Sequence, residues 1–185
     1  MNRDKYVQDK LGKTNLIPSI DRCKLCEEAI KNEGEAYSSW ITVSDGESQW
    51  SPNFVNFDVV TENLRDFLNN SLWKRDNFLK HPLTVVYVCG LDHYNKCQEI
   101  DILVKQNHVA VGVIHRLNQD ERNVQRFNQL PNAFYIPLIN NRNKNQDLSS
   151  TQIRNHYQNF KNDITVIPLG VCPAVHQYML RYYKK

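Results

Sequence analysis

Three nearly unbroken apolar runs dominate the second half of the chain: "LTVVYVCG" at 83–90, "HVAVGVIHR" at 108–116 and "AFYIPLI" at 133–139. Runs of this kind, rich in valine and isoleucine, are typical of strands that are covered on both faces. Polar segments compatible with helices separate them. Strands that alternate with helices predict an α/β fold built on a parallel sheet flanked by helices.

Apolar residues at helical spacing predict the helices. Asp21 is expected to cap the first of them, and Pro173 is expected in the first turn of the last. The short stretch "SWITV" at 39–43 is interpreted as a further strand. The predicted helices cover 22–32, 54–68, 149–160 and 172–183.

Composition and charge narrow the class of protein. A chain of 185 residues with 41% apolar and 23% charged residues fits a single globular domain over 1–185. A net charge of +3 suits an anionic small molecule but is too weak and scattered to predict nucleic-acid binding. No apolar run is long enough to cross a membrane, and the N-terminus lacks the apolar core of a signal peptide. We therefore expect an intracellular protein, cytoplasmic or nuclear.

The five cysteines are an odd number, which favours reduced thiols. Cys23 and Cys26 form a C-x-x-C pair that could supply half of a zinc site. A complete zinc site would need a second close pair of ligands. Cys89 and Cys97, with His93 between them, do not have a spacing that is typical of zinc ligands. We expect Cys23 and Cys26 on the buried side of a helix, and no bound metal.

The carboxyl ends of the predicted strands are where a parallel sheet places its ligand site. After the first run, Gly90 is expected to allow a tight turn that leaves Asp92 at the sheet edge. Asp92 either accepts hydrogen bonds from a ribose hydroxyl or an amino group, or simply caps a helix that starts at His93. After the second run, Arg116 either contacts a phosphate or is a solvated charge at the strand end.

The stretch "DLSSTQIR" at 147–154 follows the third run. Ser149 or Ser150 is expected to cap the next helix, so that free backbone N–H groups, the hydroxyls and the positive end of the helix dipole meet at one place. Arg154, one turn later, can add a guanidinium group to the same anion. The pattern therefore predicts phosphate binding at this helix start.

"LSSTQIR" resembles the I-S-S-T-x-I-R signature of the nicotinamide/nicotinate mononucleotide adenylyltransferases. "VCGLDHY" is similar to the G-x-D segment of that family, and "PAVHQYM" to its closing helix. Upstream, "YVQDKLGKTNLIPSIDRCKLCEEAI" and "WITVSDGES" resemble its substrate loop and its tryptophan segment. The resemblance runs in order over almost the whole chain and implies a Rossmann-like nucleotidylyltransferase fold.

The resemblance implies transfer of an adenylyl group from ATP to nicotinamide or nicotinate mononucleotide, which yields NAD or its acid form and pyrophosphate. Magnesium is implied as the partner of the triphosphate. Ser149, Ser150, Thr151 and Arg154 would hold the ATP phosphates; Gly90, Asp92 and Arg116 would contact the nucleotide; Lys13 would meet the mononucleotide phosphate.

The chain also departs from the family pattern. It contains no loop of the form G-x-F-x-P-x-(H/T)-x-x-H, whose last histidine stabilises the transferring phosphate, so the chain is expected to start after the first strand and helix of the fold. The catalytic group is therefore unassigned. In the family, an aromatic residue stacks on the nicotinamide ring. The corresponding position of this chain is Asn53, so Trp50 or Phe54 would take the place of that aromatic residue.

These departures leave alternatives open. One is a catalytically inactive nucleotide-binding or scaffold protein on the same fold, and another is an unrelated α/β domain with an ordinary helix cap. The oligomeric state is also open, because a second copy of the chain could supply the missing element. The sequence does not distinguish the amide from the acid substrate.

Overall fold

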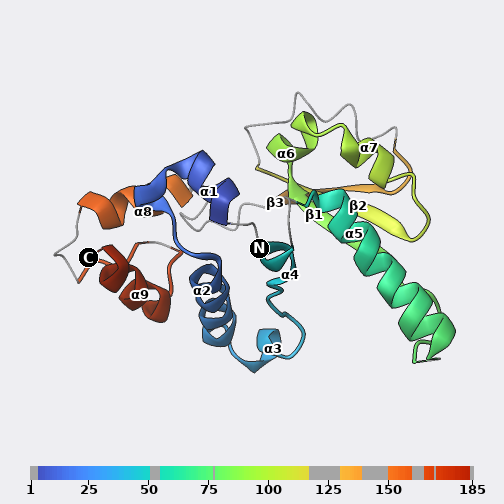
Figure 1. Cartoon of the computed structure of the whole chain (residues 1–185), viewed down its shortest axis with the longest axis horizontal. Coiled ribbons are helices and arrows are strands. Elements are labelled where there is room, and N and C mark those ends of the chain that lie inside the picture. The colour runs from blue at the N-terminus through green and yellow to red at the C-terminus, as the bar shows by residue number, and fades with distance from the viewer. Residues whose placement is uncertain are drawn as a thin grey trace. The chain divides into compact units, whose positions relative to one another are not determined.

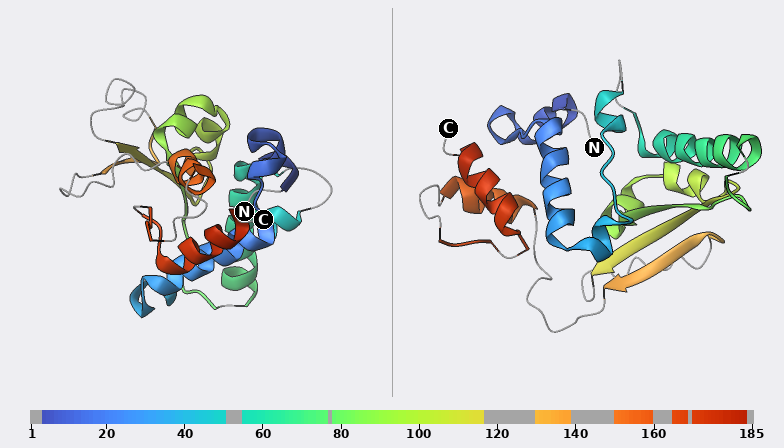
Figure 2. Two further views of the ribbon diagram at one scale, coloured as in Figure 1. Left: turned by 90° about the vertical axis from the view of Figure 1, so that its left-hand side faces the viewer. Right: turned by 90° about the horizontal axis from the view of Figure 1, so that it is seen from below.

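A computed structural model describes residues 4–50, 55–76, 78–116, 130–138, 150–159, 165–168 and 170–183. The chain divides into two compact units (Figures 1 and 2). We call Val55–Asn143 the sheet unit, and Met1–Phe54 together with Lys144–Lys185 the helical unit. Each unit has its own hydrophobic core. A single domain over 1–185 stays a prediction.

The sheet unit contains a parallel sheet of three strands within the described residues, in the order β1-β2-β3. Val85 pairs with Val109, and Val111 pairs with Ala133. The prediction of an α/β fold with a parallel sheet is therefore confirmed, and the architecture is compatible with a Rossmann-like fold. The strands are β1 (Val85–Gly90), β2 (Val109–Arg116) and β3 (Ala133–Leu138).

The core of the sheet unit lies between one face of the sheet and three helices, α5 (Phe57–Asp66), α6 (Leu91–Lys96) and α7 (Glu99–Leu103). Alternate residues of β1 and β2 point to this face, as the two-residue period of a strand requires. Burial of each large apolar side chain stabilises the fold by about 1.5–3 kcal/mol. The buried cluster comprises Cys89, Leu91, Tyr94, Ile100, Leu103, Val104, Val109, Val111 and Val113.

The other face of the sheet corrects the prediction that all three strands are covered on both sides. Val86 and Val88 of β1 and Phe134 and Ile136 of β3 are exposed large hydrophobic residues. On this face the central strand β2 is covered by side chains of the two outer strands. A Cβ added to Gly112 of β2 would lie 3.4 Å from Ile136 Cδ1 and 3.6 Å from Val88 Cγ2. Apolar side chains on β1 and β3 thus shield β2 rather than pack under helices.

Helix α5 confirms the centre of the helix predicted over 54–68, but the chain continues beyond it in a different geometry. Residues Phe67–Arg75 form η2, a π-helix of nine residues. Figure 1 draws α5 and η2 as one continuous helix. π-Helical segments are rare and are frequent at functional sites. The spacing of apolar residues gave no signal for this change.

Asn69 of η2 is buried and fastens the start of β1. Its Nδ2 donates to the Leu83 carbonyl at 2.9 Å, and its Oδ1 accepts from the Leu83 N–H at 2.7 Å. We expect Asn69→Ala to lower the free energy of unfolding by about 1–2 kcal/mol, because both hydrogen bonds are lost. Urea denaturation followed by the fluorescence of Trp73 measures this, since Trp73 is the tryptophan of the sheet unit. Asn70→Ala, at an exposed position, is the control, and equal effects of the two replacements would contradict the prediction.

The helical unit packs its helices around Tyr157, Met179 and Leu180. Helices α2 and α8 both contact α9. No helix in the described parts of the chain is long and apolar enough to span a membrane. The elements are α1 (Asp4–Leu11), the 3-10 turn η1 (Lys13–Asn15), α2 (Ser19–Asn32), α3 (Glu35–Ser38), α4 (Gly46–Gln49), α8 (Ser150–Asn159) and α9 (Pro173–Tyr183).

The start of α2 corrects the prediction that Asp21 is its cap. The helix begins at Ser19, so Asp21 lies within the first turn. The capping contact comes instead from Asp4 of α1, whose Oδ1 accepts the Ser19 N–H at 2.6 Å and pairs with Arg22 at 3.1 Å. An acceptor fifteen residues away cannot be recognised from local sequence, which explains the difference.

Two further expectations in this unit are wrong and one is confirmed. "SWITV" at 39–43 is not a strand: the indole of Trp40 donates to the Ala36 carbonyl at 2.8 Å, which holds this segment in the turn after α3. Cys23 is buried as expected, but Cys26 is exposed. Helix α9 begins at Pro173, as predicted, because the missing N–H of proline costs nothing in a first turn.

Candidate functional site

The carboxyl end of β1 brings Gly90 and Asp92 together. Helix α6 begins at Leu91, so Asp92 lies in its first turn with an exposed side chain, and the alternative in which Asp92 caps a helix starting at His93 is wrong. Gly90 has φ −80° and ψ 156°, an extended backbone that any residue adopts, so it is not required for a tight turn. Its role is spatial: a Cβ at Gly90 would lie 2.9 Å from Asp92 Oδ1. The glycine therefore leaves room for the carboxylate beside the strand end.

His93, the next residue of α6, lies in a cluster with an aromatic residue and a thiol. Its Nε2 is 3.1 Å from the Tyr87 hydroxyl, and its Nδ1 is 3.4 Å from Cys97 Sγ. Burial raises the pKa of Cys89 to about 11, with smaller contributions from the nearby Cys97 and Asp92. This thiol is therefore protonated near neutral pH. The described residues contain no group of three or more histidine, cysteine, aspartate or glutamate side chains placed to hold a metal ion.

At the carboxyl end of β2, Arg116 pairs with Leu138 in the sheet, and its side chain lies outside the described part of the structure. The residue before it, His115, is only 4% exposed and stacks on Tyr135 with ring centroids 3.8 Å apart. Its Nδ1 has no hydrogen-bond partner among the described residues. A buried nitrogen of this kind costs about 1–3 kcal/mol unless a ligand or water pairs with it. Sequence reasoning missed His115, although the adjacent arginine marked this strand end.

The start of α8 brings two of the predicted phosphate-binding residues together. Arg154 Nη2 donates to Thr151 Oγ1 at 3.1 Å. Ser150 is the first residue of the helix and its side chain is exposed, whereas Ser149 lies outside the described residues. The first-turn N–H groups and the positive end of the helix dipole lie at the same place.

A second residue that the sequence did not reveal, Tyr183 of α9, lies near Arg154. Burial raises the pKa of Tyr183, Tyr182 adds to this effect, and the positive charge of Arg154 opposes it. The Tyr183 hydroxyl is buried and has no hydrogen-bond partner among the described residues. The sequence predicted α9 only as the closing helix of the chain. The pair of tyrosines at its end is the sequence feature that could have pointed to Tyr183. The ring of Tyr183 stacks on Tyr157 of α8, with centroids 6.2 Å apart, so this tyrosine packs against the helix that carries Arg154.

The residues predicted to contact a mononucleotide are described in part. Lys13 is exposed in η1, and a side-chain contact from Gln158 to Asn15 ties η1 to α8. Trp50 is exposed directly after α4, and Phe54 lies outside the described residues.

The predicted site residues fall in both units of the structure. Gly90, Asp92 and Arg116 belong to the sheet unit; Lys13, Trp50, Phe54, Ser149, Ser150, Thr151 and Arg154 belong to the helical unit. The chain matches no protein-family model, no curated protein and no solved structure at a significant level. A proposal for the function therefore depends on the chemistry of the described side chains.

Proposed function

We propose that this protein is a nucleotidyltransferase of NAD biosynthesis, which transfers the adenylyl group of ATP to nicotinamide or nicotinate mononucleotide. The products would be NAD or its acid form and pyrophosphate. The observation that supports this most is the pairing of Thr151 with Arg154 near the start of α8, at the positions of the S-S-T-x-I-R pattern. The parallel sheet of the other unit is compatible with such an enzyme.

The phosphates of ATP would bind at the start of α8. The free N–H groups of the first turn, the hydroxyls of Ser149, Ser150 and Thr151, and the helix dipole all favour an anion there. The Arg154 guanidinium has five N–H donors, and the bond to Thr151 uses one of them. Among the described residues the remaining donors have no hydrogen-bond partner, so they would bind phosphate oxygens, where charge builds up during transfer.

In the sheet unit, Asp92 is the residue that we propose for contact with a nucleoside. The Asp92 carboxylate, for which Gly90 leaves room, accepts hydrogen bonds and so suits ribose hydroxyls. Arg116 and Lys13 would contact phosphates, and Trp50 or Phe54 would stack on the pyridine ring. The described residues form no metal-binding cluster, so magnesium would enter with the triphosphate and we assign it no protein ligand.

A second candidate is a protein that binds the nucleotide without turning it over. It is favoured by the 185-residue sequence, which contains no glycine–proline–histidine loop. In this case the α8 site would still hold phosphate, but no histidine would stabilise the phosphate during transfer. The two candidates therefore differ in turnover and agree in binding.

Pyrophosphate release with ATP, magnesium and nicotinamide mononucleotide tests the first candidate. We expect Arg154→Ala to lower kcat/KM about 30-fold, which corresponds to about 2 kcal/mol for a lost hydrogen bond to a charged phosphate. Arg181→Ala is the matched control, because Arg181 is an exposed arginine of the same unit that lies outside the proposed site. It should leave kcat/KM unchanged.

Binding measurements separate the two candidates. If no pyrophosphate is released, calorimetric titration of ATP and NAD decides: binding that weakens in Arg154→Ala supports the inactive nucleotide-binding protein. Absence of both turnover and binding at millimolar ligand would contradict both candidates. Equal turnover in the Arg154→Ala and Arg181→Ala proteins would contradict the role assigned to Arg154.

A further inference from the structure

The sheet unit contains a pocket of about 620 Å³ that has no part in the proposed reaction. It is lined by the end of α5, by η2 and by the segment Lys105–His108, which directly precedes β2. Small-molecule sites are typically about 300–1,000 Å³ in volume, so its size suits a ligand of that class.

The position of this pocket in the sheet unit distinguishes it from the predicted nucleotide contacts. Residues that precede β2 lie at the amino ends of the parallel strands, whereas Gly90 and Asp92 lie at the carboxyl end of β1. Ligands of open parallel sheets usually bind at the carboxyl ends. A ligand in this pocket would therefore occupy a second site of the unit.

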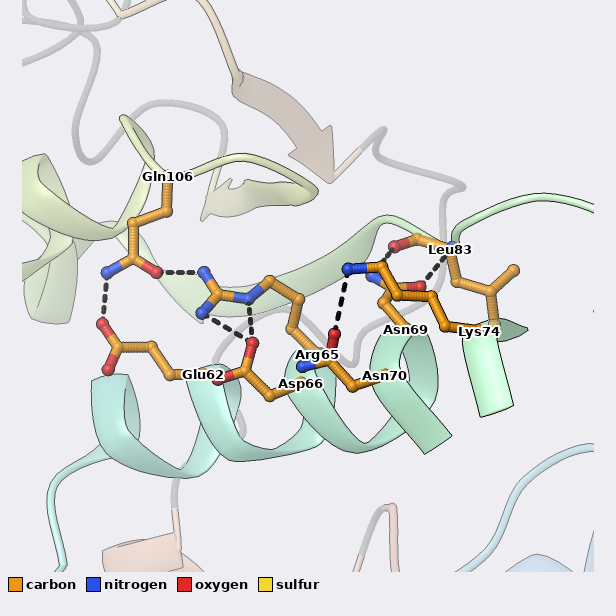
Figure 3. A network of polar contacts seen from close by, with 8 residues as sticks. All are labelled: Glu62, Arg65, Asp66, Asn69, Asn70, Lys74, Leu83 and Gln106. Carbon is orange, nitrogen blue, oxygen red and sulfur yellow. Dashed lines mark hydrogen bonds and ion pairs between the residues drawn. The ribbon is translucent and has the colours of Figure 1, made fainter. Parts of the chain in front are cut away.

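One wall of the pocket is held in place by contacts between its own side chains. Figure 3 shows Arg65 between Asp66 and Gln106, with Gln106 also reaching Glu62. The Arg65–Asp66 ion pair measures 2.9 Å. Both carboxylates of the lining therefore already have partners within the wall. The long side chains are held in one geometry before any ligand arrives, which lowers the entropy cost of binding.

The rest of the lining is positively charged and includes an aromatic ring. Lys74 and Lys105 line the pocket and are exposed. Lys74 Nζ lies 5.9 Å from the centroid of the Trp73 ring. An anion bound by Lys74 would therefore lie next to the indole of Trp73, so the pocket suits a ligand that carries its negative charge close to a planar ring.

The lining from η2 also offers amide groups for hydroxyls and ring nitrogens. Asn70 lines the pocket, and its Oδ1 accepts a hydrogen bond from Lys74 Nζ at 3.3 Å. Asn69, Asn70, Trp73 and Lys74 all belong to the π-helix. A rare helix geometry that is frequent at functional sites therefore coincides with the aromatic and cationic part of the lining.

We propose that this pocket binds a small phosphorylated nucleoside as a second ligand of the protein. The base would stack on Trp73, Lys74 and Lys105 would contact the phosphate, and the Asn70 amide would bind the ribose or the base. Each part of the lining then has a counterpart in the ligand. The inference does not depend on adenylyl transfer, because none of these residues takes part in the proposed reaction.

Trp73 fluorescence tests the proposal in the full chain. In the Trp40→Phe/Trp50→Phe protein, Trp73 is the sole tryptophan and reports on the pocket itself. Titrations with AMP, adenosine and inorganic phosphate separate the contributions of the ring and the anion. We expect AMP to change the emission with an affinity at least about tenfold higher than that of adenosine or phosphate, because AMP makes both kinds of contact.

Variants of the lysines identify where AMP binds. Lys74→Ala and Lys105→Ala should each weaken AMP about fivefold to tenfold, since a charge-assisted contact is lost. Lys96→Ala, at an exposed lysine of α6 outside the pocket, should not. Arg154→Ala should also leave the titration unchanged, which keeps this test separate from that of the proposed reaction. An emission insensitive to millimolar AMP, or a response that survives both lysine replacements, would overturn the proposal.

Discussion

Replacing Ile100 by alanine should lower the free energy of unfolding of the sheet unit by about 3 kcal/mol. Ile100 lies on α7 with 0% of its surface exposed, in the cluster that joins the helices to β2. The replacement removes buried methyl and methylene groups and leaves a cavity that a close-packed core cannot fill. Urea denaturation monitored by Trp73 fluorescence measures the change, because Trp73 belongs to the same unit.

The same helix contains the control for this prediction. Ile102 is two residues away on α7 and is 64% exposed. Ile102→Ala makes the same chemical change in the same helix, so both variants share the small gain in helix propensity. We expect Ile102→Ala to change the free energy of unfolding by less than about 0.5 kcal/mol. Similar losses in the two variants would mean that α7 does not pack as described.

The strands could be predicted from sequence because their signal is local. The runs at 83–90, 108–116 and 133–139 are apolar and β-branched, and each contains the strand found there. Which faces are covered could not be predicted in this way. An unbroken apolar run arises equally when helices cover both faces and when apolar side chains of β1 and β3 shield a central glycine.

The helices, like the strands, could be predicted only as far as their sequence signal is local. Spacing located α5 and α9, but the continuation of α5 as a π-helix depends on backbone bonding that has no local sequence pattern. The start of α2 depends on Asp4, which reaches Ser19 from another helix. Neither the π-helix nor this capping contact follows from the spacing of apolar residues.

Some residues of the candidate site could be predicted from the sequence and others could not. The hydroxyl-and-arginine pattern predicted roles for Thr151 and Arg154, and the structure pairs them because residues three apart lie on the same face of a helix. His115 and Tyr183 gave no such signal. What marks these two is a buried polar atom without a partner among the described residues, and burial arises only from tertiary packing.

The helix that carries Arg154 is anchored by a buried polar pair. The Tyr157 hydroxyl of α8 lies 2.8 Å from His176 Nδ1 of α9, and each residue is 1% exposed. Tyr157→Phe keeps the ring but deprives His176 Nδ1 of this partner inside the core. We expect the free energy of unfolding of the helical unit to fall by about 2 kcal/mol, the cost of a broken hydrogen bond between buried groups. Tyr37→Phe is the control, because Tyr37 is exposed in the same unit.

The effect of Tyr157→Phe should depend on pH in a defined direction. Burial raises the pKa of Tyr157 to about 12, with a smaller contribution from Cys172. The hydroxyl has a pKa of about 10 in the unfolded chain, so its stabilising contribution is complete below about pH 10 and is lost as the pH rises toward 12.

Phenylalanine does not ionise, so it has no corresponding loss at alkaline pH. The stability difference between the wild type and Tyr157→Phe should therefore shrink between about pH 8 and about pH 11, while other alkaline effects cancel because both proteins share them. Urea denaturation followed by circular dichroism at the two pH values measures the difference. A difference that stays constant would show that Tyr157 ionises at the same pH in the folded and unfolded chains, and the buried pair would then not hold α8 in the way its geometry indicates.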